Sequence, residues 1–122
     1  MTTDSTLEIQ NRPRFSVIRF FGFVDAGTVE RARSVIDAEI PAGCPNIIID
    51  LEKVEFLDSH GVGLFASLLK KVHGNNGLLV FAGASAQPAS VLNIVGFNGS
   101  LVTYCEDLQH ACALLEGGKK DP

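Results

Sequence analysis

Three side chains that could do chemistry stand together near the middle of the chain: Asp58, Ser59 and His60. These are the residue types of a nucleophilic triad, and Ser59 followed by x-Gly matches half of the G-x-S-x-G elbow. The other half is missing, because Leu57 stands where the elbow needs glycine. Residues adjacent at a helix start do not aim their side chains at one another, so a triad would need a distant histidine. We therefore expect no enzyme and no catalytic residue here.

The glycines that follow raise a second possibility, a dinucleotide site. Gly61, Gly63 and Ala66 have the spacing of the G-x-G-x-x-G/A fingerprint. That fingerprint needs an acidic residue about 20 residues further on to hold the ribose, but the next acid after Asp58 is Glu106. We therefore expect no nucleotide and no other cofactor. We interpret these glycines as positions of close packing or of a tight turn, and Gly61 as a residue where a partner can approach the backbone.

Ser59 stands where a strand should turn into a helix, and two roles fit it there. The local sequence favours a helix N-cap, because a serine hydroxyl accepts a hydrogen bond from a free backbone N–H of the first turn. The functional alternative is phosphorylation, since a phosphate at a helix N-terminus meets the positive end of the helix dipole. Such a phosphate would leave the fold intact, add about −1.5 to −2 charge beside Asp58 and repel a docked partner.

The elements that must position this junction are strands alternating with helices. Aromatic and β-branched runs predict the strands, apolar residues three and four apart predict the helices, and glycine or proline ends them. This order favours an α/β fold with a mixed sheet of four to five strands and about four helices. The expected strands cover residues 7–10, 15–21, 46–51 (the central strand), 78–82 and 101–104, and the expected helices 27–40, 60–73, 88–95 and 106–115.

Length and composition fit one small domain. The 122 residues are 46% hydrophobic and 20% charged, which suits a single domain of residues 1–122 with a core from about residue 7 to 116 and loose polar ends. The net charge of −4 opposes binding to nucleic acid or to an anionic bilayer. Without a signal peptide or an apolar run of about 18 residues, we expect a cytoplasmic protein with no membrane insertion.

The cysteines and the acidic residues are unevenly placed. Cys44, Cys105 and Cys112 lack the paired spacing of a zinc or redox site, so we expect free thiols and no metal. No Asp or Glu occurs in residues 59–105, where Lys70 and Lys71 are the only formal charges. Either the helices of this span carry a charge-poor docking face, or they are well buried; interface cores are depleted in charged residues.

The run LEKVEFLDSHGVGLF, residues 51–65, resembles the signature of STAS domains, specifically of the bacterial anti-sigma factor antagonists. That signature is an apolar strand followed by D-S-[S/T]-G-[L/V/I]-G. It is matched at Asp58, Ser59, Gly61, Val62 and Gly63.

The resemblance covers nearly the whole chain, from about residue 7 to 115. Upstream, FFGFVDAGT is similar to the family's strand end G-x-x-D, through Gly22 and Asp25. Downstream, residues 77–97 resemble its next strand, proline-containing turn and short helix. The chain departs at His60, where the family usually has Ser or Thr, and at Phe23 and Val24, where Glu-Leu or Arg-Leu is common.

The resemblance implies a partner switch. The unmodified protein would bind an anti-sigma factor that is also a serine kinase; this kinase would phosphorylate Ser59, and a PP2C-type phosphatase would restore it. The expected partner-binding residues are Gly22, Asp25, Asp58, Ser59, His60, Gly61 and Val62. His60, which can be partly protonated near neutral pH, could offset phosphate charge or alter recognition by the kinase; it could equally be an exposed residue without a role.

One alternative has the same fold but no phosphorylation of Ser59. In it the chain is a STAS subunit of a lipid-transport or signalling-scaffold assembly, and the same loop binds its partner without phosphorylation. Fold resemblance does not decide between these functions.

Overall fold

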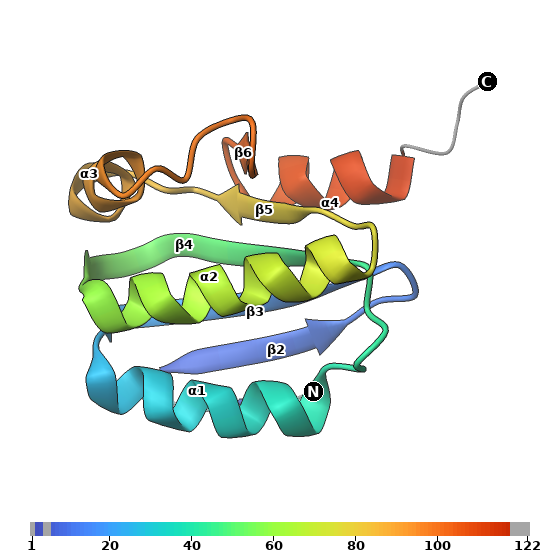
Figure 1. The fold of residues 1–122 in the computed structure, drawn as a ribbon, viewed down its shortest axis with the longest axis horizontal. Helices are drawn as coiled ribbons and strands as arrows, with labels where there is room; N and C mark the ends of the chain where they lie inside the picture. Colours follow the sequence, from blue (N-terminus) through green and yellow to red (C-terminus); the bar gives the residue numbers. More distant parts are fainter. Residues whose placement is uncertain (1, 4–5, 118–122) are drawn as a thin grey trace.

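A mixed β-sheet forms the centre of the protein in the computed structural model, which describes residues 2–3 and 6–117 (Figure 1). Within these residues six strands lie in sequence order, β1 to β6. β2 is antiparallel to both of its neighbours, β1 and β3, whereas β3, β4, β5 and β6 run parallel. The strands are β1 (Thr2–Thr3), β2 (Leu7–Asn11), β3 (Phe15–Val24), β4 (Asn46–Leu57), β5 (Leu79–Ala82) and β6 (Thr103–Cys105).

Helices cover both faces of this sheet. Alternate residues of a strand point to opposite faces, and Ile47 and Ile49 join one apolar cluster while Ile48 joins another. The first cluster packs under α1, α2 and α3, and the second, smaller cluster packs under α4. The helices are α1 (Ala26–Glu39), α2 (Ser59–Gly74), α3 (Ala86–Ile94) and α4 (Leu108–Gly117).

The expected α/β class with a mixed sheet is confirmed, and the count of strands exceeds the expected four to five because of β1. β1 has two residues and lies within a segment that we expected to be loose. The rest of that segment and residues 119–122 lie outside the described residues.

Two strands are longer than predicted. β4 was expected to end at Leu51 but continues to Leu57, because Val54 and Leu57 still point into the core while the backbone keeps its pairing with β3. β3 was expected to turn at Gly22 but continues to Val24. Gly22 lies within β3 at a φ of +74°, next to a shift in the strand register, a conformation that glycine adopts without strain.

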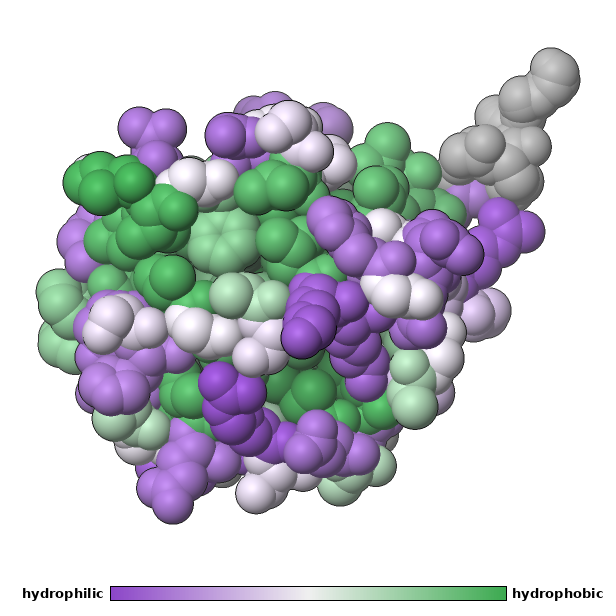
Figure 2. Space-filling model, in the orientation of Figure 1, coloured by the Kyte–Doolittle hydropathy of each residue, from purple (hydrophilic) through white to green (hydrophobic). Residues whose placement is uncertain are grey.

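Burial and a docking face each explain part of the span without acidic residues. The apolar residues of α2, among them Leu64, Phe65 and Leu68, are buried, so burial accounts for that helix. The end of α3 is different, because Ile94 and Val95 are 78% and 48% exposed. Figure 2 shows the resulting hydrophobic surface over α3, at the upper left. The exposed end of α3 therefore supports the docking-face prediction, which stays a prediction.

A charged pair at the start of α4 gives a pH-dependent prediction. Asp107 accepts hydrogen bonds from the backbone N–H of His110 and from its Nδ1 at 2.8 and 2.6 Å. The backbone and side-chain hydrogen bonds to His110 lower the pKa of Asp107, and the side-chain hydrogen bond to Asp107 raises the pKa of His110. Their pairing therefore stabilises the fold fully between pH 3.8 and pH 6.5, the ordinary pKa values of the two groups. This stabilisation is lost as the pH falls through the lowered pKa of Asp107 or rises through the raised pKa of His110.

We expect the His110 imidazole to titrate above 6.5 in the folded protein, as measured by NMR. The variant Asp107→Asn should bring the midpoint back toward the ordinary value. A midpoint at or below 6.5 in the wild-type protein would contradict the pairing.

Candidate functional site

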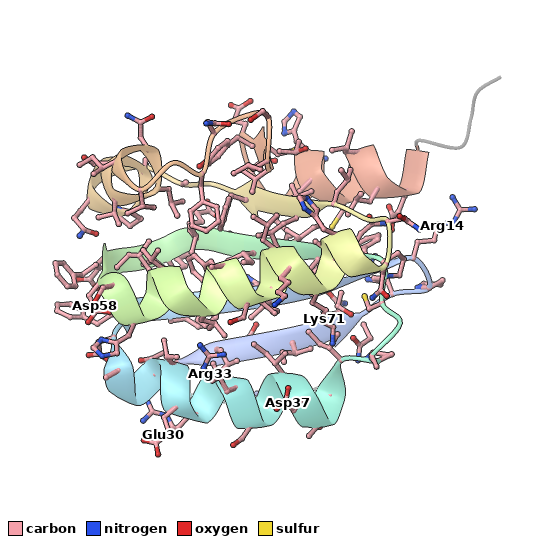
Figure 3. All side chains as sticks on the ribbon, viewed as in Figure 1. Arg14, Glu30, Arg33, Asp37, Asp58 and Lys71 are labelled. Carbon is pink, nitrogen blue, oxygen red and sulfur yellow. The ribbon has the colours of Figure 1, made fainter. Side chains whose placement is uncertain are left out.

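The carboxyl ends of β3 and β4 bring two aspartates to the same edge of the sheet. Val24 and Leu57 are register partners, and each is followed by an aspartate that caps the next helix, Asp25 for α1 and Asp58 for α2. The backbone N–H of Asp58 donates to the carbonyl of Val24 at 3.2 Å, which joins the two strand ends. Figure 3 shows Asp58 at the start of α2, at the opposite end of the molecule from Arg14.

The prediction that Ser59 caps α2 is wrong, because Asp58 does so. Asp58 has extended backbone angles, φ −109° and ψ −173°, and helical geometry begins at Ser59. One carboxylate oxygen of Asp58 accepts from the backbone N–H groups of His60 at 2.8 Å and Gly61 at 3.3 Å. These are the second and third positions of the helix, which an N-cap side chain normally satisfies. Ser59 is therefore the first residue of α2.

Because Asp58 is the cap, its removal should weaken the fold. Asp58→Ala is expected to lower the free energy of unfolding by about 1 kcal/mol, a typical cost for a lost N-cap. Asp58→Asn is the matched control, since asparagine caps as well as aspartate and should cost only a few tenths of a kcal/mol. Denaturant unfolding followed by circular dichroism measures both, and equal stability of Asp58→Ala and the wild type would contradict the capping role.

With the cap supplied by its neighbour, the Ser59 side chain is left uncommitted. It is exposed, and within residues 2–3 and 6–117 its hydroxyl makes no hydrogen bond to another side chain or to the backbone. The His60 ring, 58% exposed, lies with its Nδ1 3.5 Å from a carboxylate oxygen of Asp58. The imidazole thus approaches Asp58, against our expectation for residues so close in sequence, but it does not reach Ser59. The close contact of the His60 ring is therefore with Asp58.

Gly61 is a packing residue. It is buried, and a Cβ at this position would run into Leu57 Cδ1 and lie 2.9 Å from Val24 Cγ1. The absence of a side chain lets the first turn of α2 sit directly on the ends of β3 and β4. Gly63, by contrast, has open space around it. The two glycines therefore differ in their packing, and direct contact of Gly61 with a partner stays a prediction.

A contact that the sequence did not reveal fixes α3 beside the site. The side-chain amide of Gln87 accepts from the backbone N–H of Leu57 and donates to its carbonyl, both at 2.9 Å. Gln87 thus pairs with the last residue of β4 as a neighbouring strand would. Only the residue type, a glutamine beside Pro88, was visible beforehand, and nothing in it indicated this role.

The other predicted partner-binding residues lie around Ser59 to different degrees. Asp25 is half-buried, and its carboxylate accepts from the backbone N–H of Thr28 at 3.2 Å. Val62 is half-buried and packs against the large core cluster. Gly22 is partly exposed on β3, three residues before Asp25. The structure therefore brings Asp25 and Asp58 together and leaves Gly22 further back along its strand.

Two exposed aromatic residues complete this edge, and sequence reasoning had marked only the first, as a departure from the family. Phe23 and Phe56 are register partners on β3 and β4 and are 55% and 40% exposed. Their ring centroids are 5.6 Å apart, with an angle of 36° between the planes. Two exposed phenylalanines in contact at the edge that carries Ser59 form an apolar surface suited to protein contact.

Within the described part of the chain, no three His, Cys, Asp or Glu side chains are grouped so that they could hold a metal ion. Cys44, Cys105 and Cys112 are free thiols. None of the described helices is long and apolar enough to cross a membrane.

These features define an α/β domain that presents one uncommitted serine at the carboxyl edge of its sheet. A model of the STAS domain matches residues 6–111, so the chain belongs to the STAS domain family. The anti-sigma F factor antagonist of Lysinibacillus sphaericus is 32% identical over 92 residues, which cover 75% of this chain and 79% of that protein. The anti-sigma-B factor antagonist of Staphylococcus aureus strain NCTC 8325 / PS 47 is 29% identical over 90 residues, covering 74% and 83%.

A solved structure extends the likeness to the fold. The Bacillus cell fate determinant SpoIIAA in its phosphorylated form matches with a TM-score of 0.70 and 25% identity, covering 89% of this chain and 99% of that one. The similarity to the family, predicted from the signature around Ser59, is confirmed.

Proposed function

We propose that this chain is an anti-sigma factor antagonist, a protein-binding module without catalysis of its own. In its unphosphorylated form it binds an anti-sigma factor that is also a serine kinase, and phosphorylation of Ser59 releases that partner. A PP2C-type phosphatase returns the serine to its free form. Relatives named as antagonists of anti-sigma factors support the class of partner.

The observation that carries the proposal is that Asp58, and not Ser59, caps helix α2. Asp58 satisfies the free N–H groups at the start of α2, so the hydroxyl of Ser59 is not needed to hold the helix. A kinase can therefore modify Ser59 without removing a structural contact. The modification acts on the surface and leaves the fold unchanged.

The charges around Ser59 explain how a phosphate would act. The phosphate would carry about −1.5 to −2 charge and would stand beside Asp58, whose carboxylate already occupies the N–H groups of His60 and Gly61. The helix dipole favours a negative charge at this end, so the domain tolerates the phosphate. A partner that has docked against Asp58 and an uncharged Ser59 meets repulsion or loses its fit.

The test is phosphate transfer with purified components. An anti-sigma factor kinase that binds the purified protein is incubated with it and ATP, and the products are analysed by peptide mass spectrometry. We expect one phosphate, on Ser59, and none on Ser67, an exposed serine of the same helix. Transfer to another residue, or no transfer to a folded protein that binds the kinase, would contradict the proposal.

A further inference from the structure

The second half of β4 has two more residues than the part of β3 beside it. Residues 20–24 of β3 are matched by residues 51–57 of β4, with two shifts in register. Such an extra residue is a β-bulge, which sets two residues of one strand against one of the other and bends the bulged strand. Val54 and Leu57 are both buried in the cluster under α1, α2 and α3, although residues three apart point to opposite faces of a regular strand. A bulge between them therefore lets both side chains enter the core.

The bulges also determine where Ser59 lies. If the register of the first half continued, Val24 would lie opposite Glu55, and Ser59 would stand two residues, about 7 Å, further beyond the end of β3. In the bulged register Val24 lies opposite Leu57, and the backbone N–H of Asp58 donates to the Val24 carbonyl at 3.2 Å. The ends of β3 and β4 are therefore level, and Ser59 begins α2 at the edge that they share.

A buried carboxylate holds the backbone at the first bulge. Asp50 is 2% exposed, and its Oδ1 accepts from the backbone N–H of Glu52 at 3.0 Å. Glu52 is one of the two residues of β4 that are matched by the single residue Phe20 of β3. Because a bulge disrupts the ladder of backbone hydrogen bonds locally, a side-chain acceptor at this point fixes the chain where strand pairing is irregular.

Asp50 is also the last residue of β4 that pairs with a strand on each side. It lies opposite Arg19 of β3 and Ala82 of β5. Beyond it, among the described residues, β4 pairs with β3 alone (Figure 1). Gly83, which follows Ala82 at a φ of +70°, packs so closely that a Cβ there would lie 3.1 Å from Cβ of Glu52. The first bulge therefore lies where β4 loses the support of β5.

Arg19 supplies the positive charge that a buried carboxylate needs. Its Nε donates to Oδ2 of Asp50 at 3.0 Å, and its Nη1 lies 3.8 Å from Oε1 of Glu8. The guanidinium also lies over the ring of Phe21, 5.6 Å from the centroid. A buried charge is tolerated when it is paired and hydrogen-bonded. Arg19 therefore binds one carboxylate oxygen of Asp50 and leaves the other, Oδ1, for the bulge.

We propose that Asp50 is a positioning residue for Ser59. Together with Arg19 it fixes the first bulge of β4, and so sets where the end of this strand and the serine that follows it stand at the carboxyl edge of the sheet. This inference rests on the proposed function, because it concerns how Ser59 is presented to the partner and to its kinase. Asp50 is buried and acts through the strand, without touching a partner.

The first test measures amide hydrogen exchange by NMR in Asp50→Val and Asp50→Asn. Valine suits a buried position in a central strand but offers no acceptor to the N–H of Glu52, whereas asparagine keeps one. In Asp50→Val we expect the amides of Glu52 and Asp58 to exchange about tenfold faster than in the wild type, and that of Ile48 to change by less than about twofold. Asp50→Asn should resemble the wild type at all three amides. Equal acceleration at all three in Asp50→Val, or none at Glu52 and Asp58, would overturn the proposal.

A second measurement uses the wild-type protein and does not depend on whether a variant folds. The hydrogen bond between the Glu52 amide and the Asp50 carboxylate should give a through-bond NMR coupling between the amide nitrogen and the carboxyl carbon. We also expect the Glu52 amide to exchange as slowly as the amides of the regular part of β4. A Glu52 amide that exchanges freely and shows no coupling to Asp50 would overturn the proposal.

Phosphorylation then connects the strand to Ser59. An anti-sigma factor kinase that binds the purified protein is supplied with the wild type, Asp50→Val and Asp50→Asn. We expect kcat/KM for Ser59 to fall about tenfold in Asp50→Val, because displacement of a reacting group is costly, and to stay within about twofold in Asp50→Asn. Faster exchange at the end of β4 with unchanged phosphorylation in Asp50→Val would overturn the positioning of Ser59.

The two readouts separate this inference from the proposed switch. If the wild-type protein binds the kinase but is not phosphorylated on Ser59, the switch fails, and faster exchange at Glu52 and Asp58 in Asp50→Val still supports Asp50 as the residue that places the end of β4. If the wild type is phosphorylated on Ser59 and Asp50→Val matches it in both exchange and kcat/KM, the switch stands and the role of Asp50 is overturned.

Discussion

Ser59→Asp is expected to weaken binding of the anti-sigma partner by about ten- to a hundredfold, which corresponds to roughly 1.4–2.7 kcal/mol. The reason is the added negative charge beside Asp58 at the centre of the proposed interface. The effect should be smaller than that of phosphate, because a carboxylate carries one charge and phosphate about −1.5 to −2. Isothermal titration calorimetry with the purified kinase measures the change. Ser59→Ala should bind like the wild type and accept no phosphate at this position.

Ser67→Asp is the matched control for this prediction. Ser67 is exposed on the same helix, eight residues and therefore about 12 Å along its axis from Ser59. The Ser67→Asp variant adds the same charge to the same helix. If proximity to Asp58 decides the effect, the affinity of this variant for the anti-sigma partner should stay within about twofold of the wild type. Equal losses from both variants would show that net charge, and not the position of Ser59, governs binding.

Gly61→Ala is expected to be the most damaging small substitution near the site. The new methyl group would run into Leu57 Cδ1 and lie 2.9 Å from Val24 Cγ1 and 3.1 Å from the Val24 carbonyl oxygen. Overpacking of this kind costs about 1–3 kcal/mol, more than the roughly 0.5–1 kcal/mol that alanine gains over glycine inside a helix. The result should be a less stable protein whose Ser59 edge is displaced.

Gly63→Ala isolates the steric cause. Gly63 lies two residues further along α2, with open space where a Cβ would stand. This variant should be as stable as the wild type or more stable by up to about 1 kcal/mol. Denaturant midpoints of the two variants make the comparison. Equal stability of both variants would show that Gly61 does not hold α2 against the strand ends.

Much of the fold follows from local patterns. The apolar stripes predicted all four helices. The apolar run at residues 46–51 marked the central strand, because such a run is typical of a strand covered by helices on at least one face and flanked on both edges. The ends of β3 and β4 were missed for a physical reason. Beyond Leu51 the strand is held by pairing with β3, and pairing between distant segments leaves no local signal.

The site was predicted in outline and corrected in detail. Asp58 and Ser59 are both preferred N-caps, so residue type alone could not choose between them. The choice depends on where helical backbone angles begin, which is at Ser59. The aromatic pair was equally hidden, because Phe23 and Phe56 meet only through the strand register. Gln87 could not be found either, since its two bonds to Leu57 depend on where α3 packs.

The most direct test of the central claim is the phosphorylation state of Ser59 in the native organism. Intact-mass and peptide mass spectrometry would be applied to the protein isolated from cells grown under several conditions, with a Ser59→Ala strain as control. The account predicts a single phosphate on Ser59 in at least one condition, absent from the Ser59→Ala strain. A protein that never carries phosphate on Ser59 under any condition would contradict the switch and favour a STAS subunit that binds its partner without modification.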